Sequence, residues 1–106
     1  FEPRSNTTRR NIFQQEFVAA FDPADEIIIA PPYQPEKIPE GERLDPARLV
    51  EDLKKRGKRA RTLSKGEDVS EIVERIGKEA VSGDVICMMS NGDFGGIHRK
   101  IIQRLK

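Results

Sequence analysis

The chain has 106 residues, which allows one domain at most, and 36% of them are hydrophobic, 35% are charged and the formal net charge is +1. This balance is typical of a globular domain, and the near-zero net charge provides no general attraction to nucleic acid or to a membrane surface. No apolar run approaches the roughly 18 to 20 residues of a membrane span, and no segment resembles a signal peptide. The single cysteine, Cys87, cannot form an internal disulfide, which fits a reducing cytoplasm.

The first part of the chain predicts a helix, a strand and a proline-rich loop. Residues 1–5 have the character of a strand end that enters a polar loop, so we expect the strand itself to be missing. Cap-forming residues at 5–8 precede apolar residues at helical spacing, which predicts a helix over residues 8–20. Residues 27–30 are apolar throughout and predict the first whole strand. The prolines that follow predict a stiff, non-helical loop over residues 31–43.

The next part predicts two capped helices with a short strand between them. Asp45 followed by Pro46 is an N-cap with proline at the first helical position, and Gly57 ends this helix. Residues 59–63 are a short strand candidate. Asp68 with Glu71 three residues later is a capping-box start. The buried face of the helix that begins there is predicted to be Val69, Ile72, Val73, Ile76 and Ala80.

Residues 83–98 combine an apolar run, a glycine-rich turn and the start of a helix. The run over residues 85–89 does not alternate, so it predicts a strand buried on both faces, with Cys87 as a small buried hydrophobe rather than a reactive thiol. Three glycines lie between residues 92 and 96, and the apolar spacing after them is helical. A strand, a glycine turn and a helix N-terminus present backbone amides to a ligand at the carboxyl edge of a sheet.

This order of elements predicts the α/β class. We expect a three-layer, Rossmann-like domain whose mostly parallel sheet lacks its first strand and carries helices on both faces. The expected binding edge is the one at which the strands end and the glycine turn begins.

The sequence contains no phosphate loop, dinucleotide fingerprint, paired-cysteine metal spacing or nucleophile elbow. His98 is the single histidine, so a metal site built on histidines is excluded; it is either a ligand contact or a surface residue. The arginines of residues 1–10 either grip a carboxylate or phosphate or lie in a solvated loop. The basic run over residues 54–61 is interpreted as a solvated helix end, because no aromatic residues interleave with it.

Three segments resemble one known family. The segments are the phrase S-N-G-D-F-G-G-I-H at 90–98, the phrase F-E-P-R-S-N-T at 1–7 and the Ala-Asp pair at 24–25 before a strand. They resemble the C-terminal domain of the Mur ligases. The resemblance covers essentially the whole chain. It is strongest to the branch that joins UDP-N-acetylmuramate to a recycled murein tripeptide, L-alanyl-γ-D-glutamyl-meso-diaminopimelate. Asp93 is a departure, because glycine is common there in that branch.

The resemblance implies that residues 1–106 are the substrate-binding, C-terminal domain of a three-domain cytoplasmic enzyme. Such ligases use ATP and magnesium to convert a carboxylate into an acyl phosphate, which the amino group of the incoming substrate attacks. The N-terminal domain holds the UDP-sugar, and the central domain carries the phosphate loop and the metal site. ATP and magnesium would therefore bind mainly outside this chain, which alone would be inactive. The implied partners are UDP-N-acetylmuramate, the tripeptide and the other two domains, without nucleic acid or membrane.

By position, the resemblance implies eight binding residues on three loops that face the nucleotide or the incoming peptide. They are Arg4, Asn6 and Arg10 on the first loop, Tyr33 on the second, and Ser90, Asn91, Phe94 and His98 on the third. No catalytic residue and no metal ligand is implied within the chain. The alternative is a non-enzymatic α/β module that binds a nucleotide or a partner, and the residues upstream of Phe1 would distinguish the two.

Overall fold

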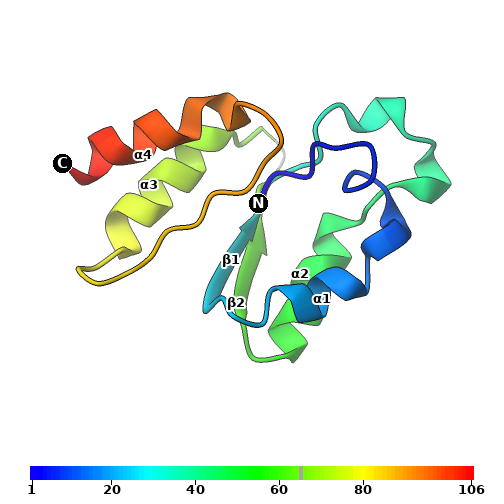
Figure 1. The fold of residues 1–106 in the computed structure, drawn as a ribbon, viewed down its shortest axis with the longest axis horizontal. Helices are drawn as coiled ribbons and strands as arrows, with labels where there is room; N and C mark the ends of the chain where they lie inside the picture. The colour runs from blue at the N-terminus through cyan, green and yellow to red at the C-terminus, as the bar shows by residue number, and fades with distance from the viewer. Residues whose placement is uncertain (65) are drawn as a thin grey trace.

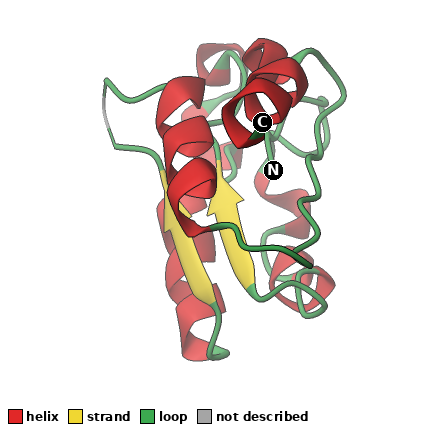
Figure 2. Ribbon diagram, turned by 90° about the vertical axis from the view of Figure 1, so that its left-hand side faces the viewer, coloured by secondary structure: helices red, strands yellow, loops and turns green. Residues whose placement is uncertain are grey.

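A computed structural model describes residues 1–64 and 66–106 and shows a parallel pair of strands between two layers of helices (Figure 1). The helices and strands are, in chain order, α1 (Glu16–Ala20), β1 (Glu26–Ile29), α2 (Pro46–Lys55), β2 (Arg59–Thr62), α3 (Val69–Glu79) and α4 (Ile97–Leu105). β1 and β2 pair in register, with Ile27 opposite Ala60. Helices α1 and α2 lie on one side of the strands, and α3 and α4 on the other (Figures 1 and 2). The predicted α/β class is confirmed.

The two faces of β1 belong to two separate hydrophobic cores. Ile27 and Ile29 pack with the apolar residues of α1, α2 and β2. Ile28 points the other way and packs with Ala30 against the cluster formed by α3 and α4. Side chains alternate along a strand, so a run of three isoleucines serves both layers at once. The position of β1 between the two cores explains why residues 27–29 are all isoleucine.

The predicted N-caps of α2 and α3 are confirmed, but the contact of Asp68 is with Ser70 rather than the reciprocal contact with Glu71 that a capping box requires. The Asp45 carboxylate accepts the Arg48 N–H at 3.1 Å, and Gly57 follows α2 at φ +82°, where glycine has no steric penalty. At the start of α3, the Asp68 carboxylate accepts the N–H of Ser70 at 2.8 Å. The hydrogen bond from the Ser70 hydroxyl to the same carboxylate, the bond from the Ser70 N–H and the nearby Lys100 charge hold the pKa of Asp68 below its usual value.

The predicted continuous helix over residues 8–20 is wrong, because a buried side chain interrupts it. The structure has a 3-10 turn at Asn11–Phe13 and then the short α1. Between them lies Gln14, which is buried and exchanges two hydrogen bonds with the main chain of Asp45, at 3.0 and 2.9 Å. This long-range pairing fixes the chain where a helix would otherwise continue. The loop over residues 31–43 is likewise not wholly non-helical, since it contains 3-10 turns at Pro35–Lys37 and Glu40–Glu42.

The prediction of a strand buried on both faces over residues 85–89 is also wrong. The segment has no assigned strand, Val85 is 92% exposed, and Cys87 is exposed rather than a buried hydrophobe. Ile86 and Met88, by contrast, pack against the α3–α4 core. The segment therefore covers a core on one side only, and its apolar composition reflects one buried face and one open face.

Phe1 pairs with β1 like a residue within a sheet. Its amino group donates to the Ile28 carbonyl at 2.8 Å, and its own carbonyl accepts from the Ala30 N–H at 2.8 Å. On the other side, the Glu2 N–H donates to the Met89 carbonyl at 2.9 Å. Burial in this position lowers the pKa of the Phe1 amino group to about 6. Residues 1–2 thus join β1 to the extended 85–89 segment.

Candidate functional site

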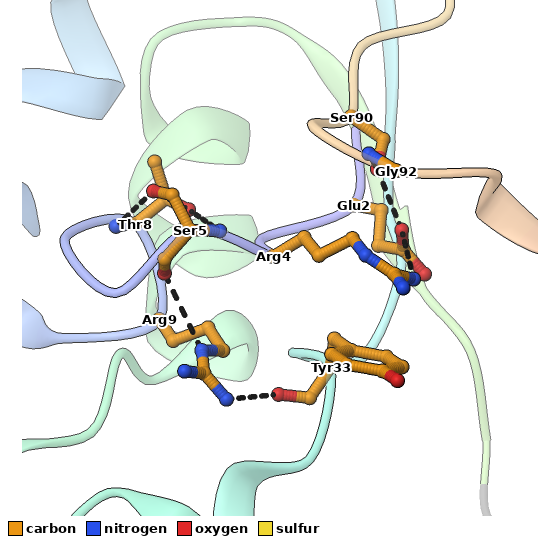
Figure 3. A network of polar contacts seen from close by, with 8 residues as sticks. All are labelled: Glu2, Arg4, Ser5, Thr8, Arg9, Tyr33, Ser90 and Gly92. Carbon is orange, nitrogen blue, oxygen red and sulfur yellow. Dashed lines mark hydrogen bonds and ion pairs between the residues drawn. The ribbon is translucent and has the colours of Figure 1, made fainter.

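Three loops meet at the end of β1, as the sheet topology predicts. We call them the arginine loop (residues 2–10), the tyrosine loop (residues 31–35) and the glycine turn (residues 90–96). The Tyr33 N–H donates to the Pro3 carbonyl at 2.9 Å, which joins the first two loops. The Ser90 hydroxyl donates to the Glu2 carboxylate at 2.6 Å, which joins the first and the third. Figure 3 shows this network of polar contacts.

The arginine loop is held in one conformation by its own side chains. The hydroxyls of Ser5 and Thr8 lie 2.8 Å apart, and each accepts the main-chain N–H of the other residue at 3.0 Å. Arg9 then ties this loop to the tyrosine loop, because its guanidinium donates to the Tyr33 carbonyl at 2.9 Å and to the Gln34 carbonyl at 3.3 Å. A loop fixed in this way presents its remaining side chains at defined positions.

The Arg4 guanidinium lies over an aromatic ring at the centre of this junction. The Cζ atom of its guanidinium is 3.7 Å from the centroid of the Tyr33 ring (Figure 3). Its charged partner is Glu2, at 3.7 Å between Nη1 and Oε1. That distance exceeds the about 2.7 to 3.2 Å of an N–H···O hydrogen bond. Among the described residues, the Arg4 N–H groups are therefore oriented by stacking and charge but are not occupied by hydrogen bonds.

The other predicted arginine of this loop has a different role. Arg10 donates to the Glu42 carboxylate at 3.0 Å, and its main chain forms an isolated bridge with Arg43. Its side chain is thus engaged with the segment that precedes α2. Of Arg4, Arg9 and Arg10, Arg4 is the one whose guanidinium donates no hydrogen bond to another described residue, so all of its donors remain available to an anionic ligand.

The glycine turn has an unusual left-handed conformation. Phe94, Gly95 and Gly96 have φ values of +49°, +60° and +71°. Two of these residues are glycines, which adopt such angles without a steric cost. Phe94 is not, and its ring is 2% exposed within the α3–α4 core. Anchoring of that ring holds the turn at the start of α4.

The structure brings together three of the eight predicted site residues: Arg4, Tyr33 and Ser90. Asn6, Asn91 and His98 are exposed on the same loops or on the first turn of α4. The binding roles of all eight residues, including Arg10 and the buried Phe94, stay predictions. The other five residues of the network were not among the predicted site residues, namely Glu2, Ser5, Thr8, Arg9 and Gly92. All five lie in segments that the sequence analysis singles out, at residues 1–10 and 90–98, but the partners of Glu2 and Arg9 are distant along the chain.

Two other charged regions lie away from these loops. In the basic run over residues 54–61, Arg56 pairs with Asp22, and Lys58 donates to the Asp22 carbonyl at 2.7 Å. This pairing lowers the pKa of Asp22 and fits the interpretation of a solvated helix end. A cavity of about 140 Å³ between β2 and α3 has charges of both signs in its lining, including Arg61, Glu71 and Arg75. It does not include any residue of the three loops.

Residues 1–64 and 66–106 contain no group of three or more His, Cys, Asp or Glu side chains placed to hold a metal ion. No helix in the same residues has both the length and the apolar character needed to cross a bilayer.

Comparison with curated proteins identifies ligases as relatives. The chain is 33% identical over 104 residues to the UDP-N-acetylmuramate–L-alanyl-gamma-D-glutamyl-meso-2,6-diaminoheptandioate ligase of Escherichia coli K12, covering 98% of this chain and 20% of that protein. It is 31% identical over 105 residues to the ligase of the same name from Haemophilus influenzae, with 99% and 20% covered. It is also 34% identical over 91 residues to the UDP-N-acetylmuramate–L-alanine ligase of Novosphingobium aromaticivorans, with 82% and 18% covered. The chain is homologous to part of the Mur ligases.

This homology agrees with the resemblance carried by the glycine turn and the arginine loop, and it extends over nearly the whole chain. The chain spans about a fifth of the length of the curated Mur ligases that it matches. No family model matches the chain. No solved structure matches it either.

Proposed function

We propose that this chain is the C-terminal, substrate-binding domain of an ATP-dependent Mur ligase that joins UDP-N-acetylmuramate to a murein tripeptide. The observation that carries the proposal is the position of Arg4. It lies where three loops meet, it is oriented by the Tyr33 ring, and its N–H groups are available. The two relatives named for this tripeptide each cover 98% or more of the chain.

The chemistry of the tripeptide suits this receptor. L-alanyl-γ-D-glutamyl-meso-diaminopimelate has several free carboxylates, and a guanidinium binds a carboxylate through two parallel N–H···O bonds. Tyr33 restricts the plane of the Arg4 fork before the ligand arrives, which reduces the entropy lost on binding. We therefore assign a peptide carboxylate to Arg4, with the exposed Asn6 of the arginine loop and Asn91 of the glycine turn as further polar contacts.

In this proposal the chain binds and orients the incoming amine. The acyl phosphate would form with ATP and magnesium on residues of the central domain, and no step of that chemistry is assigned to the residues described here. Holding the alanyl amino group close to an activated carboxylate, in the right orientation, accelerates formation of the amide bond. The isolated chain is expected to bind the peptide without turnover.

The test uses the full-length protein that contains this chain. Phosphate release is measured with ATP, UDP-N-acetylmuramate and either the tripeptide or L-alanine as the amine. We expect release with the tripeptide. Release with L-alanine alone would instead assign the substrate named for the Novosphingobium relative. No release with either amine would favour the non-enzymatic binding module.

Arg4→Met then tests the site. The loss of charge-assisted hydrogen bonds is worth about 1.5 to 3 kcal/mol, which raises the KM for tripeptide roughly ten- to hundredfold. The KM for UDP-N-acetylmuramate should not change. The matched control is Arg10→Met, because Arg10 is engaged with Glu42. Equal effects of the two substitutions would contradict the assignment of the carboxylate to Arg4.

A further inference from the structure

We infer that Glu2 is a positioning residue that holds the Arg4 guanidinium on Tyr33 and couples it to the glycine turn. The inference rests on the proposed function for its kinetic consequence, but its structural content concerns the free chain. One carboxylate oxygen, Oε1 of Glu2, accepts the Ser90 hydroxyl at 2.6 Å and lies 3.7 Å from Nη1 of Arg4. The Glu2 side chain is 13% exposed, so it is largely withdrawn from solvent and directed into the junction.

The main chain around Glu2 is fixed independently of this carboxylate. The Glu2 N–H donates to the Met89 carbonyl at 2.9 Å, and the next residue, Pro3, is fully buried. The carboxylate therefore projects from a rigid point. Ser90 continues the contact, since its hydroxyl oxygen accepts the Gly92 N–H at 3.1 Å. A chain of contacts thus runs from Arg4 through Glu2 and Ser90 to Gly92 (Figure 3).

Gly92 provides the space that this arrangement requires. A Cβ atom at position 92 would lie 2.1 Å from Nε, 2.4 Å from Cδ and 2.5 Å from Cζ of Arg4. The Arg4 side chain therefore passes directly over the main chain of the glycine turn on its way to the Tyr33 ring. A side chain at position 92 would displace the guanidinium, although the turn itself has no positive φ there.

The charge of Glu2 has a second consequence. It balances Arg4 when no ligand is present, yet at 3.7 Å it leaves the N–H groups free for an incoming carboxylate. A carboxylate at hydrogen-bond distance from Arg4 would compete with the ligand for its N–H groups. Without any charged partner, the long Arg4 side chain could move away from the Tyr33 ring. The structure assigns Glu2 the intermediate role of orienting Arg4 without occupying it.

The first measurement is made on the free 106-residue chain by NMR. The Nε–Hε signal of Arg4, assigned by its loss in Arg4→Lys, should be shifted upfield because the side chain lies over the Tyr33 ring. Glu2→Gln retains an acceptor for Ser90 but removes the charge, and it should lose part of this shift. Glu2→Ala and Gly92→Ala should lose most of it. The matched control is Glu36→Gln, an exposed glutamate next to the tyrosine loop, which should retain the shift.

The second measurement is steady-state kinetics in the full-length ligase. Glu2→Ala should raise the KM for tripeptide about tenfold, with the KM for UDP-N-acetylmuramate unchanged. If Glu2→Ala does not fold, Ser90→Ala tests the same contact from its other end.

The outcomes separate this inference from the proposed function. An upfield shift that survives in both Glu2→Ala and Gly92→Ala overturns the inference. A shift that is lost while the KM for tripeptide stays at its original value supports the positioning of Arg4 by Glu2 and overturns the peptide site instead. A rise in the KM for UDP-N-acetylmuramate alone also overturns the assignment of these loops to the peptide.

Discussion

Alanine at Gly95 tests whether the left-handed glycine turn is set by its packing against α3. Gly95 and Gly96 have nearly the same backbone angles, with φ and ψ of 60° and 22° at Gly95 and of 71° and 23° at Gly96. An alanine in this conformation costs about 1 to 2 kcal/mol of folding free energy at either position. The surroundings differ. A Cβ at position 95 would lie 2.8 Å from the Cγ2 methyl of Val69, whereas the nearest atom to one at position 96 is Asp93 Oδ2 at 3.9 Å.

The difference between the two variants isolates the contact with Val69. A carbon pair at 2.8 Å is far inside the optimal separation of about 3.5 to 4.0 Å. Val69 is β-branched and begins α3, so its side chain has few ways to move aside. Overpacking of this kind costs about 1 to 3 kcal/mol. We therefore expect Gly96→Ala to lose about 1 to 2 kcal/mol, and Gly95→Ala to lose about 2 to 5 kcal/mol.

The assay is urea unfolding of the 106-residue chain followed by far-ultraviolet circular dichroism. Both substitutions are also made in a Val69→Ala background, where the excess cost at position 95 should shrink because the colliding methyl is gone. Equal losses for the two glycines, or an excess that persists without the Val69 methyls, would refute the reasoning.

Further predictions concern the N-terminal pairing and the 85–89 segment. In the folded 106-residue chain, the pKa of the Phe1 amino group is lowered from 8.0 to about 6. Between these two pH values the unfolded chain binds more protons than the folded chain. The free energy of unfolding should therefore rise with pH across that window, by at most about 2 to 3 kcal/mol. N-terminal acetylation should abolish this rise, which urea titrations at successive pH values would measure. If the acetylated chain keeps the same pH dependence, the buried Phe1 amino group is not its cause. Val85→Ser should change the unfolding free energy by less than about 0.5 kcal/mol because Val85 is 92% exposed, whereas Ile86→Ala should cost about 1 to 3 kcal/mol. The open apolar side of residues 85–89 should also favour self-association, which light scattering over a range of concentrations would detect and Val85→Lys should weaken.

Local signals predicted the elements whose ends are set by neighbouring residues. Asp45 with Pro46, Gly57 and Asp68 fixed the bounds of α2 and the start of α3, because capping and positive φ depend on a few consecutive residues. The isoleucines of β1 were equally clear. A strand that is buried on both faces needs consecutive apolar residues, and such a run is visible in the sequence.

Long-range partners could not be predicted from the sequence. Residues 85–89 are as apolar as β1, but what covers one face of a segment is decided elsewhere in the chain, and here Val85 is open. The same holds at the site. Arg4 and Arg10 look alike in the sequence, and only the fold directs one to Tyr33 and the other to Glu42. Phe94 lies in a polar, glycine-rich phrase, yet a left-handed turn sends its ring into the core.

The two cores on either side of β1 have a consequence for motion. The arginine and tyrosine loops lie on the side of the strands that holds α1 and α2 (Figure 1), whereas Phe94 of the glycine turn packs in the core of α3 and α4. A domain with two such units can open one of them without unfolding the other, and amide hydrogen exchange then reports two opening free energies. Each opening of the α3–α4 layer would carry Ser90 away from Glu2 and dismantle the junction. A ligand that contacts both sides is therefore expected to slow amide exchange in α4, far from its own contacts, by an amount that grows with its concentration.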